Sequence, residues 1–244
     1  MLLQKALSTL YPDQCVSCGA MVEGAHALCG SCWTATPFID GLVCDACGVP
    51  LLGDKADDAD AERPHCDDCM VRPPLWDRGR AAFLYRDNAR RMILRLKHGD
   101  RIDLARPCGG WLAPLVRELL PPDGVLVPVP LHWTRMVLRR FNQAALLAKA
   151  AARETGHMAV PDALLRLKRT PSQENRTREE RMVNVGGAMA INPPRAQSIE
   201  GRDVLVIDDV MTSGATLTEA TRVLREEGAS QVSVLALARV AKEA

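Results

Sequence analysis

The sequence is poor in aromatic residues. Phe, Trp and Tyr together make up only 4% of its 244 residues. Proteins that bind single-stranded nucleic acid without sequence preference usually stack successive bases on several aromatic side chains. The composition therefore weighs against a binding surface of that kind.

Long apolar runs are also missing. No run approaches the roughly 20 residues of a membrane-spanning helix, and the apolar stretch after Met1 is too short for a secretory signal peptide. We therefore expect a cytoplasmic protein with no membrane span, in which residues 1–7 form a short docking helix. A hydrophobic content of 47% and a charged content of 25% are typical of a globular protein.

The net charge of +1 hides an asymmetry between the two parts of the chain. Residues 1–78 carry five Lys/Arg and twelve Asp/Glu, a net charge of −7. Residues 79–244 carry the remaining 26 Lys/Arg and 18 Asp/Glu, a net charge of +8. A positive field of this kind fits a phosphorylated substrate or a nucleic acid. The basic part of the chain is therefore where we expect an anionic ligand.

Eight of the nine cysteines form four Cys-x-x-Cys pairs. This spacing lets two thiolates from one tight turn bind a single ion, and four thiolates complete a tetrahedral Zn²⁺ shell. Disulfides or redox pairs are the less favoured alternative. We predict two structural zinc sites formed by sequential pairs, with an interleaved arrangement left open: Cys15, Cys18, Cys29 and Cys32 in one, and Cys44, Cys47, Cys66 and Cys69 in the other.

The basic part is organised around residues 204–216, VLVIDDVMTSGAT. Four apolar residues, three of them β-branched, run directly into Asp208 and Asp209, which fits a strand buried on both faces of a parallel sheet. Residues 217–227 then show helical spacing. Ligands of open α/β sheets bind outside the carboxyl ends of such strands. The stretch therefore predicts an α/β fold with a ligand site after the strand.

The loop after the acidic pair is suited to a phosphate. Backbone N–H groups at the start of a helix attract anions, and Gly214 lets the backbone come close. The loop has no lysine, so it is not a Walker loop. Two nearby carboxylates favour a ligand that also offers hydroxyls or carries Mg²⁺. We predict a sugar-phosphate site with the phosphate held by Thr212, Ser213, Gly214, Ala215 and Thr216.

Further strands and helices alternate along the basic part. We expect strands at residues 81–85, 124–131, 164–168, 185–191 and 231–238, and helices at residues 89–97, 110–120 and about 143–154. Residues 169–184 are polar without an apolar period and predict a long loop that acts as a lid. Three arginines, Arg135, Arg139 and Arg140, follow the strand at residues 124–131. Because guanidinium groups match phosphate oxygens, they are candidates for an anion site.

The chain also resembles known proteins. Residues 208–216 are similar to the phosphoribosyltransferase signature, and nearly the whole chain resembles the ComF/GntX family, which is associated with DNA uptake for transformation or with the use of DNA as a nutrient. The family usually has Gly where this chain has Arg140, and Phe where it has Met189. The matching pieces are the four Cys-x-x-Cys pairs, Leu96-Lys97 with Arg101, Pro128-Val-Pro-Leu131 with Arg139-Arg140-Phe141-Asn142-Gln143, Thr170-x-x-Gln173 with Arg181-x-x-Asn184, and residues 208–216.

The resemblance implies a zinc-binding module over residues 1–75 and a type I phosphoribosyltransferase-like parallel sheet flanked by helices over residues 76–244. Its ligand would be phosphoribosyl pyrophosphate (PRPP) with Mg²⁺. Asp208 and Asp209 would hold the ribose hydroxyls and stabilise positive charge on the ring as pyrophosphate leaves. The arginines implied at the pyrophosphate loop and the flexible hood are Arg135, Arg139, Arg140, Arg169 and Arg181.

Two classes of function follow from these patterns. One is an enzyme that transfers phosphoribosyl to an acceptor that no residue of the sequence identifies. The other is a DNA-uptake factor that binds single-stranded DNA and works with other uptake proteins, its PRPP site being regulatory or vestigial. The intact acidic pair and loop favour a working ligand site.

Overall fold

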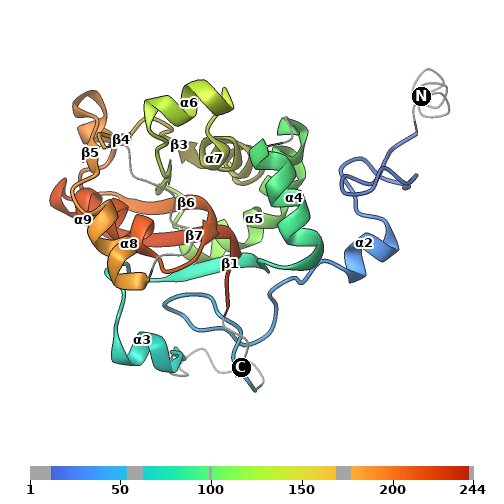
Figure 1. Ribbon diagram of the computed structural model, residues 1–244. Helices are drawn as coiled ribbons and strands as arrows, with labels where there is room; N and C mark the ends of the chain where they lie inside the picture. Colours follow the sequence, from blue (N-terminus) through green and yellow to red (C-terminus); the bar gives the residue numbers. More distant parts are fainter. Residues whose placement is uncertain (1–11, 54–62, 99–100, 169–176, 242–244) are drawn as a thin grey trace.

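The computed structural model describes residues 12–53, 63–98, 101–168 and 177–241. The helix expected at residues 1–7 lies outside the described residues. Figure 1 shows a helix-flanked sheet, with the cysteine-bearing segments placed beside it. Among the described residues, no helix is both long and apolar enough to cross a membrane.

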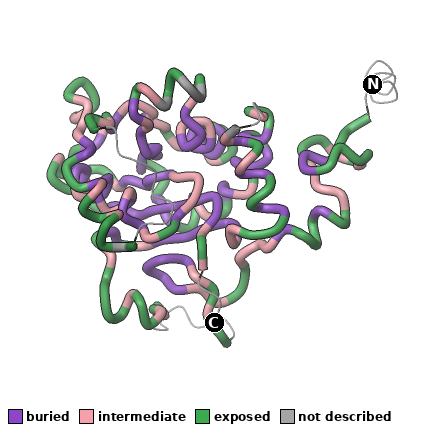
Figure 2. Tube along the Cα trace, in the orientation of Figure 1, coloured by how far each residue is buried: buried purple, intermediate pink, exposed green. Residues whose placement is uncertain are grey.

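The central sheet has five strands, all parallel. This confirms the predicted α/β fold with a parallel sheet. Figure 2 shows that the strands are largely buried, as a sheet covered on both faces should be. In spatial order the strands are β1 (Gly79–Leu84), β7 (Gln231–Arg239), β6 (Asp203–Met211), β2 (Val125–Pro128) and β3 (Met158–Ala159).

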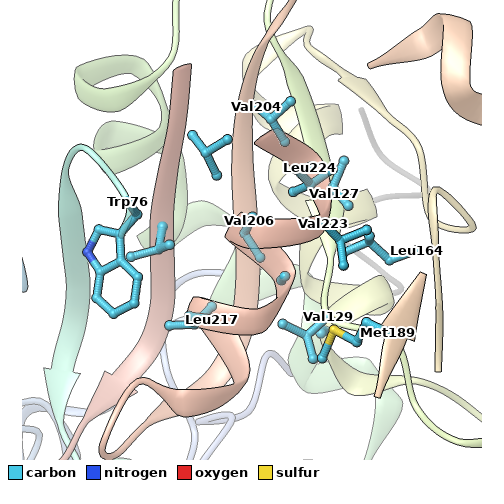
Figure 3. Close-up of a cluster of buried hydrophobic side chains, with 14 of the residues drawn as sticks. Trp76, Val127, Val129, Leu164, Met189, Val204, Val206, Leu217, Val223 and Leu224 are labelled. Carbon is cyan, nitrogen blue, oxygen red and sulfur yellow. The ribbon is translucent and has the colours of Figure 1, made fainter. Parts of the chain in front are cut away.

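The two faces of the sheet bury separate apolar clusters. Val204 and Val206 of β6 belong to one cluster and Leu205 and Ile207 to the other, the period of two expected of a strand. The first cluster, drawn in Figure 3, contains side chains of helix α9 (Ala215–Glu226). The second contains side chains of α4 (Asp87–His98), α5 (Ala105–Leu119) and α7 (Gln143–Thr155).

The prediction of a long loop at residues 169–184 was wrong for part of this stretch. Residues 169–176 lie outside the described residues, but α8 (Arg178–Val185) is a helix. It begins with a capping box, in which Thr177 Oγ1 accepts from the Glu180 N–H and the Glu180 carboxylate accepts from the Thr177 N–H. These bonds satisfy helix-end donors independently of any apolar period. The expected strand at residues 185–191 is correspondingly shorter, because Val185 ends the helix.

Outside the main sheet, β5 (Met189–Ile191) pairs antiparallel with β4 (Leu164–Arg166) as a separate two-stranded sheet. A further helix, α6 (Trp133–Arg139), follows β2 and was not expected. The remaining short elements are α2 (Gly30–Thr34), α3 (Asp67–Val71) and the 3₁₀ turns η1 (Ile102–Leu104) and η2 (Pro193–Ser198).

The segment between the second and third cysteine pairs covers the outer edge of β1. Phe38 forms an antiparallel bridge with Phe83, and the Ile39 N–H donates to the Ala82 carbonyl. The Phe38 ring also lies edge-on to Phe83 and Trp111. An otherwise open strand edge is thereby paired, and the cysteine-bearing segment is fastened to the sheet.

Candidate functional site

The acidic pair lies where two strand pairings diverge. Strand β6 does not stop before Asp208, as its apolar run suggested, but continues to Met211. It stays paired with β7 through Met211, whereas its ladder with β2 ends at Ile207. From the neighbouring strands β2 and β6 the chain leads in opposite directions along the sheet: β2 is followed by β3 on one side, and β6 is followed by β7 on the other. The pair therefore occupies a topological switch point, the common place for ligands in open α/β sheets.

The two carboxylates have different electrostatic surroundings. Asp209 forms an ion pair with Lys97 of α4, at 3.0 Å between Oδ1 and Nζ. Asp208 accepts from the Asp209 N–H at 2.8 Å. Desolvation by the surrounding protein, followed by repulsion from Asp209, raises the pKa of Asp208 to about 7, although Lys97 and Arg166 act in the opposite direction. Lys97 was not among the predicted site residues. Its place in the resemblance, beside Leu96, was the available signal.

The predicted phosphate loop lines a pocket together with Asp208 and Arg181. Helix α9 begins at Ala215, two residues earlier than expected, and its first backbone bond runs from the Thr218 N–H to the Gly214 carbonyl. The N–H groups of residues 215–217 are thus left without intrahelical acceptors at the pocket. Such a helix start is suited to an anion.

Gly214 has a role that the sequence did not predict. It adopts a φ of 79°, in the left-handed region. A Cβ built on it would lie 2.7 Å from Cη2 of Trp76. The missing side chain therefore faces Trp76, and this packing and the positive φ both require glycine here.

The predicted arginines are only partly brought together. Arg181 lines the pocket, and its Nε is buried without a hydrogen-bond partner among the described residues. Asn184, one turn further along α8, has an equally unpartnered Nδ2 in that part of the chain. The side chains of Arg135 and Arg139 and the whole of Arg169 lie outside the described residues. Two unpartnered polar groups on one helix face are what a missing polar ligand would leave.

The two departures from the family pattern are accommodated locally. Arg140 ends α6 with a φ of 63°, a left-handed conformation that glycine adopts without strain. The turn is thus kept despite the larger residue. Met189 is buried in the first apolar cluster, where it acts as a core residue.

The eight paired cysteines form two groups in sequential order. The first cysteine group is Cys15, Cys18, Cys29 and Cys32, and the second cysteine group is Cys44, Cys47, Cys66 and Cys69. Within each group the sulfur atoms lie within 4.8 Å of one another, and two of the separations are 3.6 Å and 3.7 Å. Tetrahedral Zn–S bonds give sulfur separations of about 3.8 Å. Both groups fit structural zinc, and the interleaved arrangement is excluded.

The two groups attach to different parts of the sheet domain. The first cysteine group contacts α4, where buried Asn88 accepts from Ser17 Oγ and donates to the Cys32 carbonyl. The second contacts β1 through buried Asp45, whose carboxylate forms ion pairs with Arg78 at 2.9 Å and Arg80 at 2.7 Å. Burial favours the neutral acid, but these two arginines outweigh it and hold the pKa of Asp45 below its usual range.

Comparison with known proteins agrees with this architecture. The double zinc ribbon domain family matches residues 6–70, and the phosphoribosyl transferase domain family matches residues 143–244. Competence protein ComFC of Bacillus subtilis is 30% identical over 243 residues, covering 96% of this chain and 88% of that protein.

Two further relatives are similar over nearly their whole length. DNA utilization protein YhgH of Escherichia coli is 28% identical, and competence protein F of Haemophilus influenzae is 27% identical. Each comparison covers 93% of this chain, with 97% of the first protein and 96% of the second. With its double zinc ribbon, its parallel sheet and these relatives, the chain belongs to the ComF family.

Proposed function

We propose that the pocket binds PRPP, or a related ribose 5-phosphate, together with Mg²⁺. The observation that carries the proposal is the meeting of three features in one pocket at the switch point: Asp208 of the acidic pair, the start of α9, and Arg181 with its unpartnered, buried Nε. Carboxylates suit ribose hydroxyls, and the helix start and guanidinium suit phosphate. We assign this site to residues 76–244 and the zinc ribbons to residues 1–75.

Different residues of the pocket would bind different parts of the ligand. Asp208 and Asp209 accept hydrogen bonds from the ribose hydroxyls, while residues 212–216 hold the 5-phosphate. As the bond from C1 to pyrophosphate breaks and a nucleophilic atom of the acceptor bonds to C1, positive charge develops on the ribose, and the carboxylates stabilise it. Mg²⁺ bound with PRPP would neutralise charge on the leaving pyrophosphate. Arg140 and the arginines whose side chains are not described are candidates for the same task.

The proposed biological setting is DNA uptake or DNA use. Two of the relatives are named for competence and one for DNA utilisation. We therefore propose that PRPP chemistry or PRPP sensing serves that process, in contact with other competence proteins.

Isothermal titration calorimetry with PRPP and Mg²⁺ tests the ligand. We expect saturable binding to the parent protein and none to Gly214→Val, because the added side chain collides with Trp76 and displaces the loop. Gly110→Val is the control, since a Cβ there meets nothing within 4 Å. Equal affinity in all three proteins would show that the loop does not hold the ligand.

A second candidate function is binding of single-stranded DNA, and it has one specific observation in its favour. Trp133, at the start of α6, is 69% exposed, and Arg140 is exposed at the end of the same helix. An exposed aromatic ring can stack a base, and a cation on the same element can contact a phosphate. Binding of this kind weakens steeply with salt. Trp133→Ala should reduce affinity for oligodeoxythymidine and leave PRPP affinity unchanged. Unchanged affinity for oligodeoxythymidine with reduced affinity for PRPP would exclude this candidate.

A further inference from the structure

Trp76 is buried against the second cysteine group. Its Nε1 donates to the Ala46 carbonyl at 2.6 Å, and Ala46 lies between the ligands Cys44 and Cys47. Gly79 packs closely against this hydrogen bond, because a Cβ on it would lie 2.5 Å from the Ala46 oxygen and 3.2 Å from Trp76 Nε1. The indole N–H is thus fixed to the turn that carries two zinc ligands.

The opposite edge of the same indole contacts the phosphate loop. Cη2 and Cζ3 are the atoms that a Cβ on Gly214 would meet, at 2.7 Å and 3.4 Å. Gly214 caps α9, and Trp76 shares the first apolar cluster with Leu217 of that helix, as Figure 3 shows. One rigid ring therefore spans the distance from the zinc turn to the start of the helix.

Arg239 makes a second link from the same turn. Its Nη1 donates to the Cys47 carbonyl and lies 3.4 Å from Sδ of Met211. Met211 is the last residue of β6 and pairs with Arg239 in the sheet. Two successive carbonyls of the zinc turn thus contact side chains next to the phosphate loop. The Ala46 carbonyl contacts Trp76, and the Cys47 carbonyl contacts Arg239.

We propose that Trp76 is a positioning residue for the phosphate loop, and that it makes the affinity for a 5-phosphorylated ribose depend on the second cysteine group. The proposal rests on the proposed function of the loop. Zinc would fix the turn that carries Ala46, the turn would fix the indole, and the indole would fix Gly214 and the helix start. The loop N–H groups are then held in place before the ligand arrives, which lowers the ordering cost of binding.

The first cysteine group offers a built-in comparison. Its described contacts with the sheet domain include those to Asn88 and Arg95 of α4, whereas the turn of the second group contacts Trp76 and Arg239. The proposal therefore predicts an effect that is specific to one zinc group, not a general loss of stability.

The test uses full-length Trp76→Phe, which keeps an aromatic ring but removes the N–H donor and one ring edge. Trp111→Phe is the matched control, because Trp111 contacts Phe38 and Phe83 in the other apolar cluster. Titration with ribose 5-phosphate and, separately, with Mg²⁺-pyrophosphate distinguishes the loop from the rest of the site. Zinc content and melting temperature are measured on both variants.

We expect Trp76→Phe to keep its zinc and to bind ribose 5-phosphate about tenfold more weakly, equivalent to about 1.4 kcal/mol. Pyrophosphate affinity should stay unchanged, a split that a general loss of stability does not produce. Hydrogen exchange at the amides of residues 213–217 should become faster in this variant and not in Trp111→Phe. Unchanged exchange and unchanged ribose 5-phosphate affinity in Trp76→Phe overturn the proposal.

The exchange measurement needs no ligand. If the parent protein fails to bind ribose 5-phosphate, the proposed function fails, while exchange still reports whether Trp76 orders the loop. If Trp76→Phe does not fold, the test instead follows the indole N–H resonances of the ¹⁵N-labelled parent protein during titration with ribose 5-phosphate. Ribose 5-phosphate must then shift the Trp76 signal and leave that of Trp111 in place; an unshifted Trp76 signal in the saturated protein contradicts the proposal.

Discussion

The two cysteine groups have the same four ligands but different surroundings. In the first group Cys18 is exposed and the described contacts lead to α4. In the second group Cys44 and Cys47 are buried, and their turn contacts β1, Trp76 and Arg239. The same four ligands are thus attached to the sheet domain in two ways: the first group contacts α4, and the second contacts Trp76 and Arg239 beside the phosphate loop.

The largest expected difference between the groups comes from removing one ligand in each. Cys44→Ser should lower the zinc content from about two to about one per chain and destabilise the sheet domain by several kcal/mol, because zinc binding is coupled to folding. Cys18→Ser should lose the same amount of zinc but leave the main melting transition and the ligand pocket nearly intact. Elemental analysis and calorimetric melting measure both. Equal destabilisation by the two substitutions would remove the distinction.

The ion pairs beside the groups give the next largest effect. Asp45→Ala removes the buried one of the two carboxylates that pair with Arg80, which is 8% exposed, and leaves Glu118 at 2.6 Å. Loss of a buried hydrogen-bond partner of this kind costs about 1–3 kcal/mol. Asp103→Ala breaks the pair of Asp103 with Arg101, whose guanidinium contacts the Val16 carbonyl near the first group. This pair is exposed, so the expected cost is below about 1 kcal/mol. Denaturant unfolding of both variants measures the contrast; comparable losses would contradict it.

A smaller effect concerns Asp208, the member of the acidic pair that lines the pocket. The pKa of Asp208 is about 7 in the folded protein, against an ordinary value of 3.8. Between these pH values the folded state keeps a proton that the unfolded chain has released, so the free energy of unfolding falls as pH rises from about 4 to 7. Asp208→Asn stays neutral. It should match the parent at pH 4 and be more stable at pH 8. About three pKa units correspond to about 4 kcal/mol in a fully buried site, and because Asp208 is partly exposed we expect about 1–2 kcal/mol.

Asp103→Asn is the control of opposite sign. The hydrogen bond from Arg101 lowers the pKa of Asp103 and outweighs its partial burial. Its contribution to stability is present at neutral pH and is lost as pH falls through that lowered pKa. The Asn variant should therefore be less stable than the parent at pH 8 and approach it in acid. Melting curves across pH 3–9 that show the same sign for both variants would refute the assignment for Asp208.

Much of this arrangement was readable in the sequence because it depends on local patterns. The Cys-x-x-Cys spacing predicted both zinc groups, and the apolar run before Asp208 predicted the central parallel strand. Helix α8 was missed because its start depends on a capping box and not on apolar periodicity. The signal was present, since Thr177 precedes Glu180 by three residues.

The parts of the site that could not be predicted are contacts between distant segments. Lys97 and Asp209 lie far apart in the sequence, and Trp76 meets Gly214 only because β1 and the zinc turn pack beside the start of α9. Such contacts depend on strand order, which a single sequence does not encode locally. The domain boundary between residues 75 and 76 stays a prediction. Trp76, on one side of this boundary, donates a hydrogen bond to Ala46 on the other side.

The most direct test of the ribose site is calorimetric titration of the double variant Asp208→Asn with Asp209→Asn. The ligands are PRPP with Mg²⁺ and, separately, single-stranded DNA, with the parent protein alongside. If the acidic pair holds ribose hydroxyls, PRPP binding should disappear, while DNA affinity should stay equal or rise slightly because two negative charges are removed. Unchanged PRPP affinity in the folded double variant would contradict the central claim that this pocket binds a phosphorylated ribose through its carboxylates.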